Sequence, residues 1–161
     1  MDSKPTRERL GALVIELLES AAFVFAQTAE EKPSAASDIL CARIVLEYRE
    51  QVELSLCVPS QLAPELAANL LALEPDSDEA KSGAGDAVGE LSNMLAGSLA
   101  VEIFGRDVVC RLGMPRVASE TGVDHDRHFG RAPCRVSLQT EDGHRVDVTL
   151  AEIPAEAGRV P

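Results

Sequence analysis

Residues 133–153 have the sequence PCRVSLQTEDGHRVDVTLAEI, in which two runs of alternating apolar and polar residues flank Asp142-Gly143. Asp-Gly between alternating runs is a strong signal for a β-hairpin, because both residues tolerate the backbone angles of a tight turn. The stretch therefore predicts antiparallel strands over residues 133–140 and 144–153, joined by Glu141-Asp142-Gly143. Residues 154–161 are expected to be a tail.

A second hairpin is expected upstream, over residues 39–48 and 51–58, where β-branched and apolar residues are frequent. In the second of these strands Val52, Leu54 and Leu56 alternate with polar residues or cysteine, which predicts one buried face. Arg49-Glu50 would form a two-residue turn. Further along, residues 107–117 are expected to form a strand, in which Gly113 and Pro115 mark a bulge or a sheet edge.

Three segments have the periodicity or the flanking residues of helices. They are residues 6–29, residues 61–73 and residues 86–104, the last with Asp86 as its N-cap. Residues 74–86, EPDSDEAKSGAGD, are expected to be an acidic loop, and residues 119–131 a polar, mobile connector. Because hairpins impose antiparallel pairing, the order of elements predicts an α+β fold: a mostly antiparallel sheet with long helices packed on one face. Residues 1–153 are expected to form a single domain.

The composition excludes several classes of function. A net charge of −12 argues against general nucleic-acid binding and against docking on anionic lipid. The N-terminal region lacks the features of a signal peptide and no run is long enough to span a bilayer, so we expect a cytoplasmic protein. The four cysteines contain no CxxC pair and are expected to be buried or partly buried free thiols.

The helix expected over residues 86–104 contains the stretch GELSNMLAG (residues 89–97), with an asparagine and two glycines that weaken a helix. Projection at 100° per residue places Val88, Leu91, Leu95, Leu99 and Ile103 on a core stripe. Glu90, Asn93 and Gly97 project to the opposite side. Met94 borders them on one side and Gly89 and Ala96 on the other.

Two interpretations of this second stripe remain open from the residues alone. A solvated helix face is usually filled with long polar side chains, so small residues beside Glu90 and Asn93 favour a contact surface for a partner. Alternatively, the small residues allow close packing against the first helix, with Asn93 bonded to a neighbouring backbone group.

The stretch DAVGELSNMLAGSLA (residues 86–100) resembles the signature helix of the CheC/CheX/FliY phosphatase family. The shared pattern is Glu-x-x-Asn with Gly four residues later, and the order of surrounding elements over residues 8–153 is most similar to CheX-like domains. In that family the motif helix docks on the phosphorylated receiver domain of a response regulator such as CheY.

The resemblance implies a role for each residue of the motif. Asn93 would orient the water that attacks the aspartyl phosphate of the receiver, and Glu90 would pair with the active-site lysine of the receiver. Gly97 and Ala96 would permit close approach, and Met94 would complete the partner-binding surface. The divalent metal would belong to the receiver, so this chain would need no cofactor of its own. The resemblance therefore implies that the chain is a chemotaxis protein phosphatase that acts in two-component signalling.

CheC-type members carry two such helices, and here this chain departs from their pattern. The first helix contains Glu19-Ser20-Ala21-Ala22, so Ala22 stands where a second asparagine would be expected. One active site per chain is therefore implied, as in CheX, and the likeness to CheX also implies a homodimer that pairs through strand edges.

Other features point less clearly to chemistry. His125 and His128 form an HxxH spacing that could bind a metal but is more typical of a solvated turn, and His144 is expected to be exposed. The acidic segment 74–79 lacks the spacing of an EF-hand. Residues 83–85, Gly-Ala-Gly, lack the strand and the lysine of a phosphate-binding loop.

Three hypotheses follow: a phosphatase, a non-catalytic module that binds a receiver or a flagellar-switch component, and a structural dimer with its motif helix packed inside. Substitution of Asn93 separates the first two. Burial of Asn93 and Glu90 would favour the third.

Overall fold

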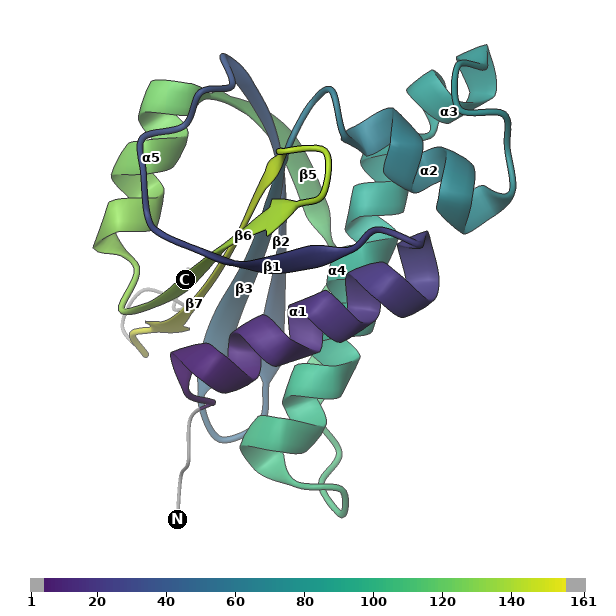
Figure 1. The fold of residues 1–161 in the computed structure, drawn as a ribbon. Helices are drawn as coiled ribbons and strands as arrows, with labels where there is room; N and C mark the ends of the chain where they lie inside the picture. Colours follow the sequence, from purple (N-terminus) through teal and green to yellow (C-terminus); the bar gives the residue numbers. More distant parts are fainter. Residues whose placement is uncertain (1–4, 156–161) are drawn as a thin grey trace, which may run out of the picture.

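Both predicted hairpins are present and lie in one seven-stranded antiparallel sheet (Figure 1). The structure is a computed structural model that describes residues 5–155. The first hairpin consists of β2 (Asp38–Glu47) and β3 (Gln51–Pro59), and the second of β6 (Cys134–Thr140) and β7 (Arg145–Ile153). Antiparallel pairing of β3 with β7 joins the two hairpins, which confirms the predicted sheet.

Three short strands complete the sheet in the order β1-β6-β7-β3-β2-β4, with β5 also paired to β2. They are β1 (Ala26–Ala29), β4 (Arg111–Leu112) and β5 (Arg116–Thr121). The single strand expected over residues 107–117 is therefore wrong in its bounds. Gly113 and Pro115 lie between β4 and β5 at the sheet edge, as their residue types indicated, and the pairing with β2 continues to Thr121.

Two long helices, α1 (Arg7–Ala22) and α4 (Ala84–Phe104), lie on one face of the sheet. The shorter α2 (Ala63–Leu71) packs against α4 and α1, and α3 (Asp78–Ser82) packs against α2 and α4. The long helices α1 and α4 bury their apolar stripes against the sheet and form the main hydrophobic core. Fully buried leucines dominate it, as the scarcity of aromatic residues required: Leu10, Leu18, Leu54, Leu56, Leu66, Leu91, Leu95, Leu99 and Leu138.

Several helix boundaries differ from those predicted. The first helix does not continue to residue 29, because Phe23 adopts a left-handed conformation (φ 54°) and the Val24 amide bonds back to the Leu18 carbonyl. The apolar periodicity continues past this point because Val24 is also buried. The acidic loop contains the short helix α3, and α4 begins at Ala84 with Gly83 as its N-cap, so Asp86 lies in the first turn instead.

The opposite face of the sheet carries α5 (Gly122–Arg131), within the segment predicted to be a mobile connector. Figure 1 shows α5 on the other side of the sheet from α1 and α4. The Thr121 hydroxyl accepts from the Asp124 amide and caps the helix. His125 and Phe129, four residues apart, are buried against the sheet. The polar composition of the segment concealed this short amphipathic pattern.

The expectation of four free cysteines is also wrong, because Cys41 and Cys57 form a disulfide across β2 and β3. The reason is the register of the hairpin. A two-residue turn at Arg49-Glu50 would pair Tyr48 with Gln51 and place Cys41 opposite Val58. The observed turn has three residues and pairs Glu47 with Gln51, so Cys41 lies opposite Cys57. A one-residue slip moves side chains to the other face of the sheet.

Among residues 5–155, no helix has the length and apolar character needed to cross a membrane. Residues 156–161, most of the expected tail, lie outside the described residues.

Candidate functional site

Helix α4 exposes the stripe that carries Glu90, Asn93 and Gly97 because its opposite side is buried. Val88, Leu91, Leu95 and Leu99 are fully buried in the core, as the helical projection predicted, and Ile103 packs against it. A 21-residue helix with such a stripe along most of its length is held firmly on the sheet. Side chains on its outer side are therefore carried by a rigid element.

Glu90 and Asn93 lie on that outer side, one turn apart. The Glu90 side chain is exposed and the Asn93 side chain is partly exposed. Within residues 5–155 neither side chain makes a hydrogen bond or an ion pair. The alternative in which Asn93 bonds to a neighbouring backbone group is therefore not observed, and their exposure counts against a motif helix packed inside a structural dimer. A carboxylate and a carboxamide are left available together.

The small residues around this pair have two different environments. A Cβ added to Gly97 would meet no atom within 4 Å, so the backbone of α4 is open there. A Cβ on Gly89 would instead lie 3.3 Å from Val117 Cγ2, so this glycine allows α4 to approach β5 rather than α1. Ala96 is fully buried in the core, whereas Met94 is 39% exposed. Glu90, Asn93, Met94 and Gly97 therefore form the exposed motif surface.

The carboxylate of Glu102, near the C-terminal end of α4, behaves differently from that of Glu90. Glu102 accepts a hydrogen bond from Arg9 of α1 at 2.5 Å, and this bond lowers the pKa of the Glu102 carboxyl. The pair links the C-terminal part of α4 to α1 at the surface. Glu102 is thus engaged within the chain, whereas Glu90 is not.

The first helix offers no second site of the same kind. Glu19 is exposed, but Ala22 is fully buried at the end of α1. The Ala22 carbonyl accepts a hydrogen bond from Asn69 Nδ2 at 2.7 Å, which ties the end of α1 to α2. This part of α1 is used for packing.

The HxxH histidines do not converge on one site. His125 is buried under α5, while His128 is exposed and contacts the Glu120 carboxylate at 3.4 Å. Neither was expected on a helix; the Thr121 cap and the i, i+4 spacing of His125 and Phe129 were the signals that could have revealed it. The proximity of His125 to the two strand cysteines could not be read from the sequence without the correct hairpin register.

Comparison with known structures shows the same fold in chemotaxis proteins. CheX from Desulfovibrio desulfuricans matches with a TM-score of 0.66 at 15% identity, over 89% of this chain and 96% of that chain. CheX from Vibrio vulnificus matches with a TM-score of 0.63 at 19% identity, over 93% and 99%. The CheX–CheY–BeF3–Mg complex from Borrelia burgdorferi matches with a TM-score of 0.67 at 14% identity, over 94% and 100%.

No curated protein matches this chain in sequence. The family model for chemotaxis phosphatase CheX, in contrast, matches residues 40–137, which include α4 and its motif surface. That match covers more than half of the chain and agrees with the structural likeness. The chain therefore belongs to the CheX chemotaxis phosphatase family.

Proposed function

We propose that this protein is a phosphatase that hydrolyses the aspartyl phosphate of a CheY-like receiver domain. The observation that carries the proposal is the pair formed by the exposed Glu90 and the partly exposed Asn93, whose side chains are unpaired within residues 5–155 on the rigid helix α4. Membership of the CheX family supports it, as does the crystallisation of a family member together with CheY.

Hydrolysis of an aspartyl phosphate requires little chemistry from the phosphatase itself. An aspartyl phosphate is an acyl phosphate, and its hydrolysis chiefly needs a water molecule held in line with the bond that breaks. Positioning and electrostatic stabilisation are the main contributions of a protein to phosphoryl transfer. The Asn93 carboxamide is neutral, so it can accept a hydrogen bond from the attacking water without repelling the phosphate. Its NH2 group can donate as well.

Glu90 has the complementary role of anchoring the helix. Its exposed carboxylate would pair with the active-site lysine of the receiver. Because Asn93 follows one turn later on the same face, this contact would set the depth at which the carboxamide enters the receiver site. The open space at Gly97 would let the two backbones approach. The divalent metal for the hydrolysis would be held by the receiver, and this chain would bring no cofactor to that reaction.

The test is phosphate release from phosphorylated CheY-like receivers of the same organism. Wild-type protein should accelerate release above receiver autohydrolysis, and Asn93→Ala should reduce that acceleration by about 100-fold, the cost of losing a positioning group. Glu90→Gln should weaken receiver binding, whereas Glu19→Gln, which removes an exposed carboxylate from α1, should change neither quantity.

Receiver binding, measured separately with a beryllofluoride-activated receiver, distinguishes catalysis from docking. If Asn93→Ala binds and acts like the wild type, or if no receiver loses phosphate faster than alone, the phosphatase proposal is wrong for those receivers. Binding without acceleration would identify a non-catalytic docking module.

We also infer a homodimer that pairs through the β4–β5 edge of the sheet. The segment that contains this edge carries the two most exposed large hydrophobic side chains of the described chain, Val109 (92% exposed) and Met114 (86% exposed). Edge strands with exposed apolar side chains are prone to pair with another chain. A second copy would cover both residues.

A further inference from the structure

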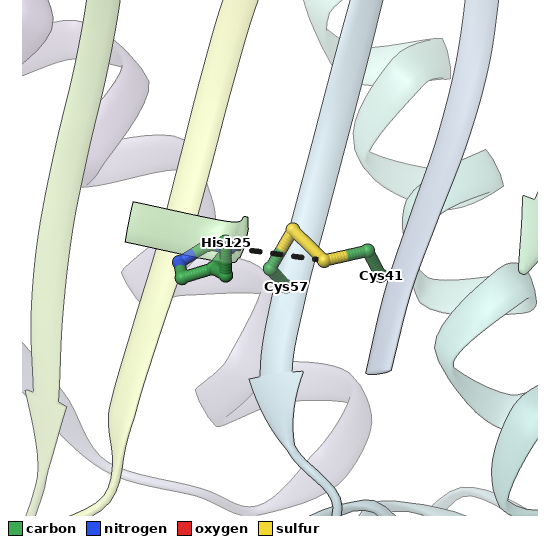
Figure 2. A group of neighbouring side chains, drawn as sticks. All are labelled: Cys41, Cys57 and His125. Atoms are coloured by element: carbon green, nitrogen blue, oxygen red, sulfur yellow. Dashed lines mark hydrogen bonds between the residues drawn. A yellow bond between two sulfur atoms is a disulfide. The ribbon is translucent and has the colours of Figure 1, made fainter. Parts of the chain in front are cut away.

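Three side chains that can bind a metal meet on the sheet face beneath α5. They are Cys41 of β2, Cys57 of β3 and His125 of α5, and their ligand atoms all lie within 4.8 Å of one another. Figure 2 shows the three side chains pointing toward one another from the two strands and the helix. Their exposed fractions are 0%, 5% and 3%, so the cluster is inside the protein and away from the motif surface on α4.

The backbone fixes this arrangement. Cys41 and Cys57 are directly opposite in the register of β2 and β3, with their Cα atoms 4.1 Å apart. Helix α5 lies over them and places His125 Nδ1 3.9 Å from Cys41 Sγ. The two sulfurs form a disulfide in this structure, so the cluster combines a disulfide with an imidazole.

A second layer of residues holds the imidazole. His125 Nε2 lies 2.6 Å from Asp147 Oδ2, and Asp147 also accepts from Ser137 Oγ at 2.5 Å and from Arg145 Nη2 at 2.7 Å. In a neutral imidazole this contact makes Nε2 the donor, which leaves the lone pair of Nδ1 facing the sulfurs. Metal-binding histidines have the same support, because a carboxylate on the other nitrogen fixes the tautomer and raises ligand basicity.

The simpler interpretation is a structural disulfide packed beside a buried histidine. A disulfide sulfur carries no hydrogen, however, so it cannot donate to the lone pair of Nδ1 in the neutral imidazole. The nitrogen would then be buried without a hydrogen-bond donor, which costs free energy. A metal ion between the sulfurs and the nitrogen would satisfy it.

We propose that, after reduction of the disulfide, Cys41, Cys57 and His125 bind one zinc ion. Two thiolates and one imidazole are ligands that zinc prefers, and three protein ligands leave a fourth tetrahedral position for water. Cys57 and His125 line a cavity of about 420 Å³, which would supply that water. The oxidised and the zinc-bound states exclude each other, because the sulfur–sulfur bond uses both thiolates.

The conversion balances with a dithiol reductant, the class of reagent that keeps intracellular thiols reduced. The reductant transfers two electrons and two protons to the disulfide and becomes a disulfide itself. Zinc then replaces the two thiol protons, which are released to water. The product contains zinc bound to two thiolate sulfurs and to the neutral Nδ1 of His125.

The experiment uses the full chain, reduced with a dithiol under anaerobic conditions and then freed of reductant. Cobalt(II) is the spectroscopic probe, because thiolate ligation gives an intense sulfur-to-cobalt charge-transfer band. Zinc should displace the cobalt ion and remove this band. We expect one metal ion per chain by native mass spectrometry. Cys57→Ser and His125→Gln should weaken zinc binding at least tenfold, and Asp147→Asn by about 10- to 100-fold through its support of His125.

Two matched controls use residues outside the cluster. Cys134→Ser removes a free cysteine, and His128→Gln removes the exposed histidine on the same helix. Both should bind zinc like the wild type. Because a cluster variant could fail to fold, the spectra and stoichiometries of the wild type and of Cys134→Ser decide the question. The proposal is overturned if the disulfide resists reduction, if the reduced protein shows no thiolate-to-cobalt band, or if Cys134→Ser abolishes that band.

Discussion

A Cβ on Gly89 of α4 would lie 3.3 Å from Val117 Cγ2 on β5, whereas a Cβ on Gly97, two turns later, would meet nothing within 4 Å. Two glycines of one motif are thus required for different reasons. Gly89 allows the helix to approach β5. Gly97 has no such role within the described chain, so its missing side chain is available to a partner.

Gly97→Ala should therefore stabilise the protein and impair its activity at the same time. Replacing an exposed helical glycine with alanine stabilises by about 0.5–1 kcal/mol, which urea denaturation measures. The added methyl group should slow dephosphorylation of the receiver because it occupies the docking space. The Gly89→Ala variant should gain less stability than the Gly97→Ala variant, because the added Cβ would force Val117 to move. A Gly97→Ala variant with full phosphatase activity would show that this space is not used for docking.

The two asparagines of the chain should respond in opposite ways to alanine. Asn69 donates to the Ala22 carbonyl at 2.7 Å, and losing that bond should cost about 1 kcal/mol of unfolding free energy. Asn93 makes no hydrogen bond within the described chain, so Asn93→Ala should keep or slightly raise stability while it reduces the acceleration of phosphate release by about 100-fold. Denaturation and phosphate-release assays on both variants test this. A large loss of stability in Asn93→Ala would assign that residue a structural role.

The sheet and the motif helix could be predicted because their signals are local. Asp142-Gly143 specifies a hairpin turn by itself, and the apolar stripe of α4 recurs at helical spacing over several turns. The exposure of Glu90 and Asn93 followed from the same projection. The phosphatase interpretation needed the family resemblance as well, because an exposed polar pair on a helix is compatible with many partners.

The parts that could not be predicted depend on contacts between distant segments. Helix α5 is short and polar, and it is held by burial of His125 and Phe129 on the second face of the sheet. The pairing of Cys41 with Cys57 depended on one residue of turn length. The end of α1 at Phe23 is set by a left-handed backbone conformation that the residue type does not indicate.

The inferred dimer can be tested by charge placed at the sheet edge. Met114→Glu and Val109→Glu should each shift the protein toward monomer, because burial of a carboxylate in an apolar interface is costly. The control is Val123→Glu, which places the same charge on an exposed valine (72% exposed) of α5, outside the edge strands. Sedimentation velocity over a range of concentrations gives the association state. A wild-type protein that stays monomeric throughout would contradict the dimer.

The ion pair between Arg43 of β2 and Glu120 of β5 should make the free energy of unfolding depend on pH at acidic pH values. Burial alone raises the pKa of Glu120, but hydrogen bonds from Arg43 and His128 outweigh it, so the folded-state pKa lies below its ordinary value. A lowered folded-state pKa means that the unfolded chain binds the proton more readily. The pair therefore stabilises the fold fully above the unfolded-state pKa of about 4.3, and this contribution is lost as the pH falls through the folded-state pKa.

Glu120→Gln should accordingly lower the unfolding free energy by roughly 1.5 kcal/mol at neutral pH, the value of a hydrogen bond to a charged group. The difference from the wild type should shrink as the pH falls from about 4.3, because the wild-type carboxyl then becomes neutral too. Glu141→Gln, in the exposed β6–β7 turn, is the matched control and should leave the pH profile unchanged. Urea denaturation across this range measures both differences. A deficit in Glu120→Gln that stayed constant at acidic pH would mean that packing of the side chain, and not its charge, stabilises the β2–β5 edge.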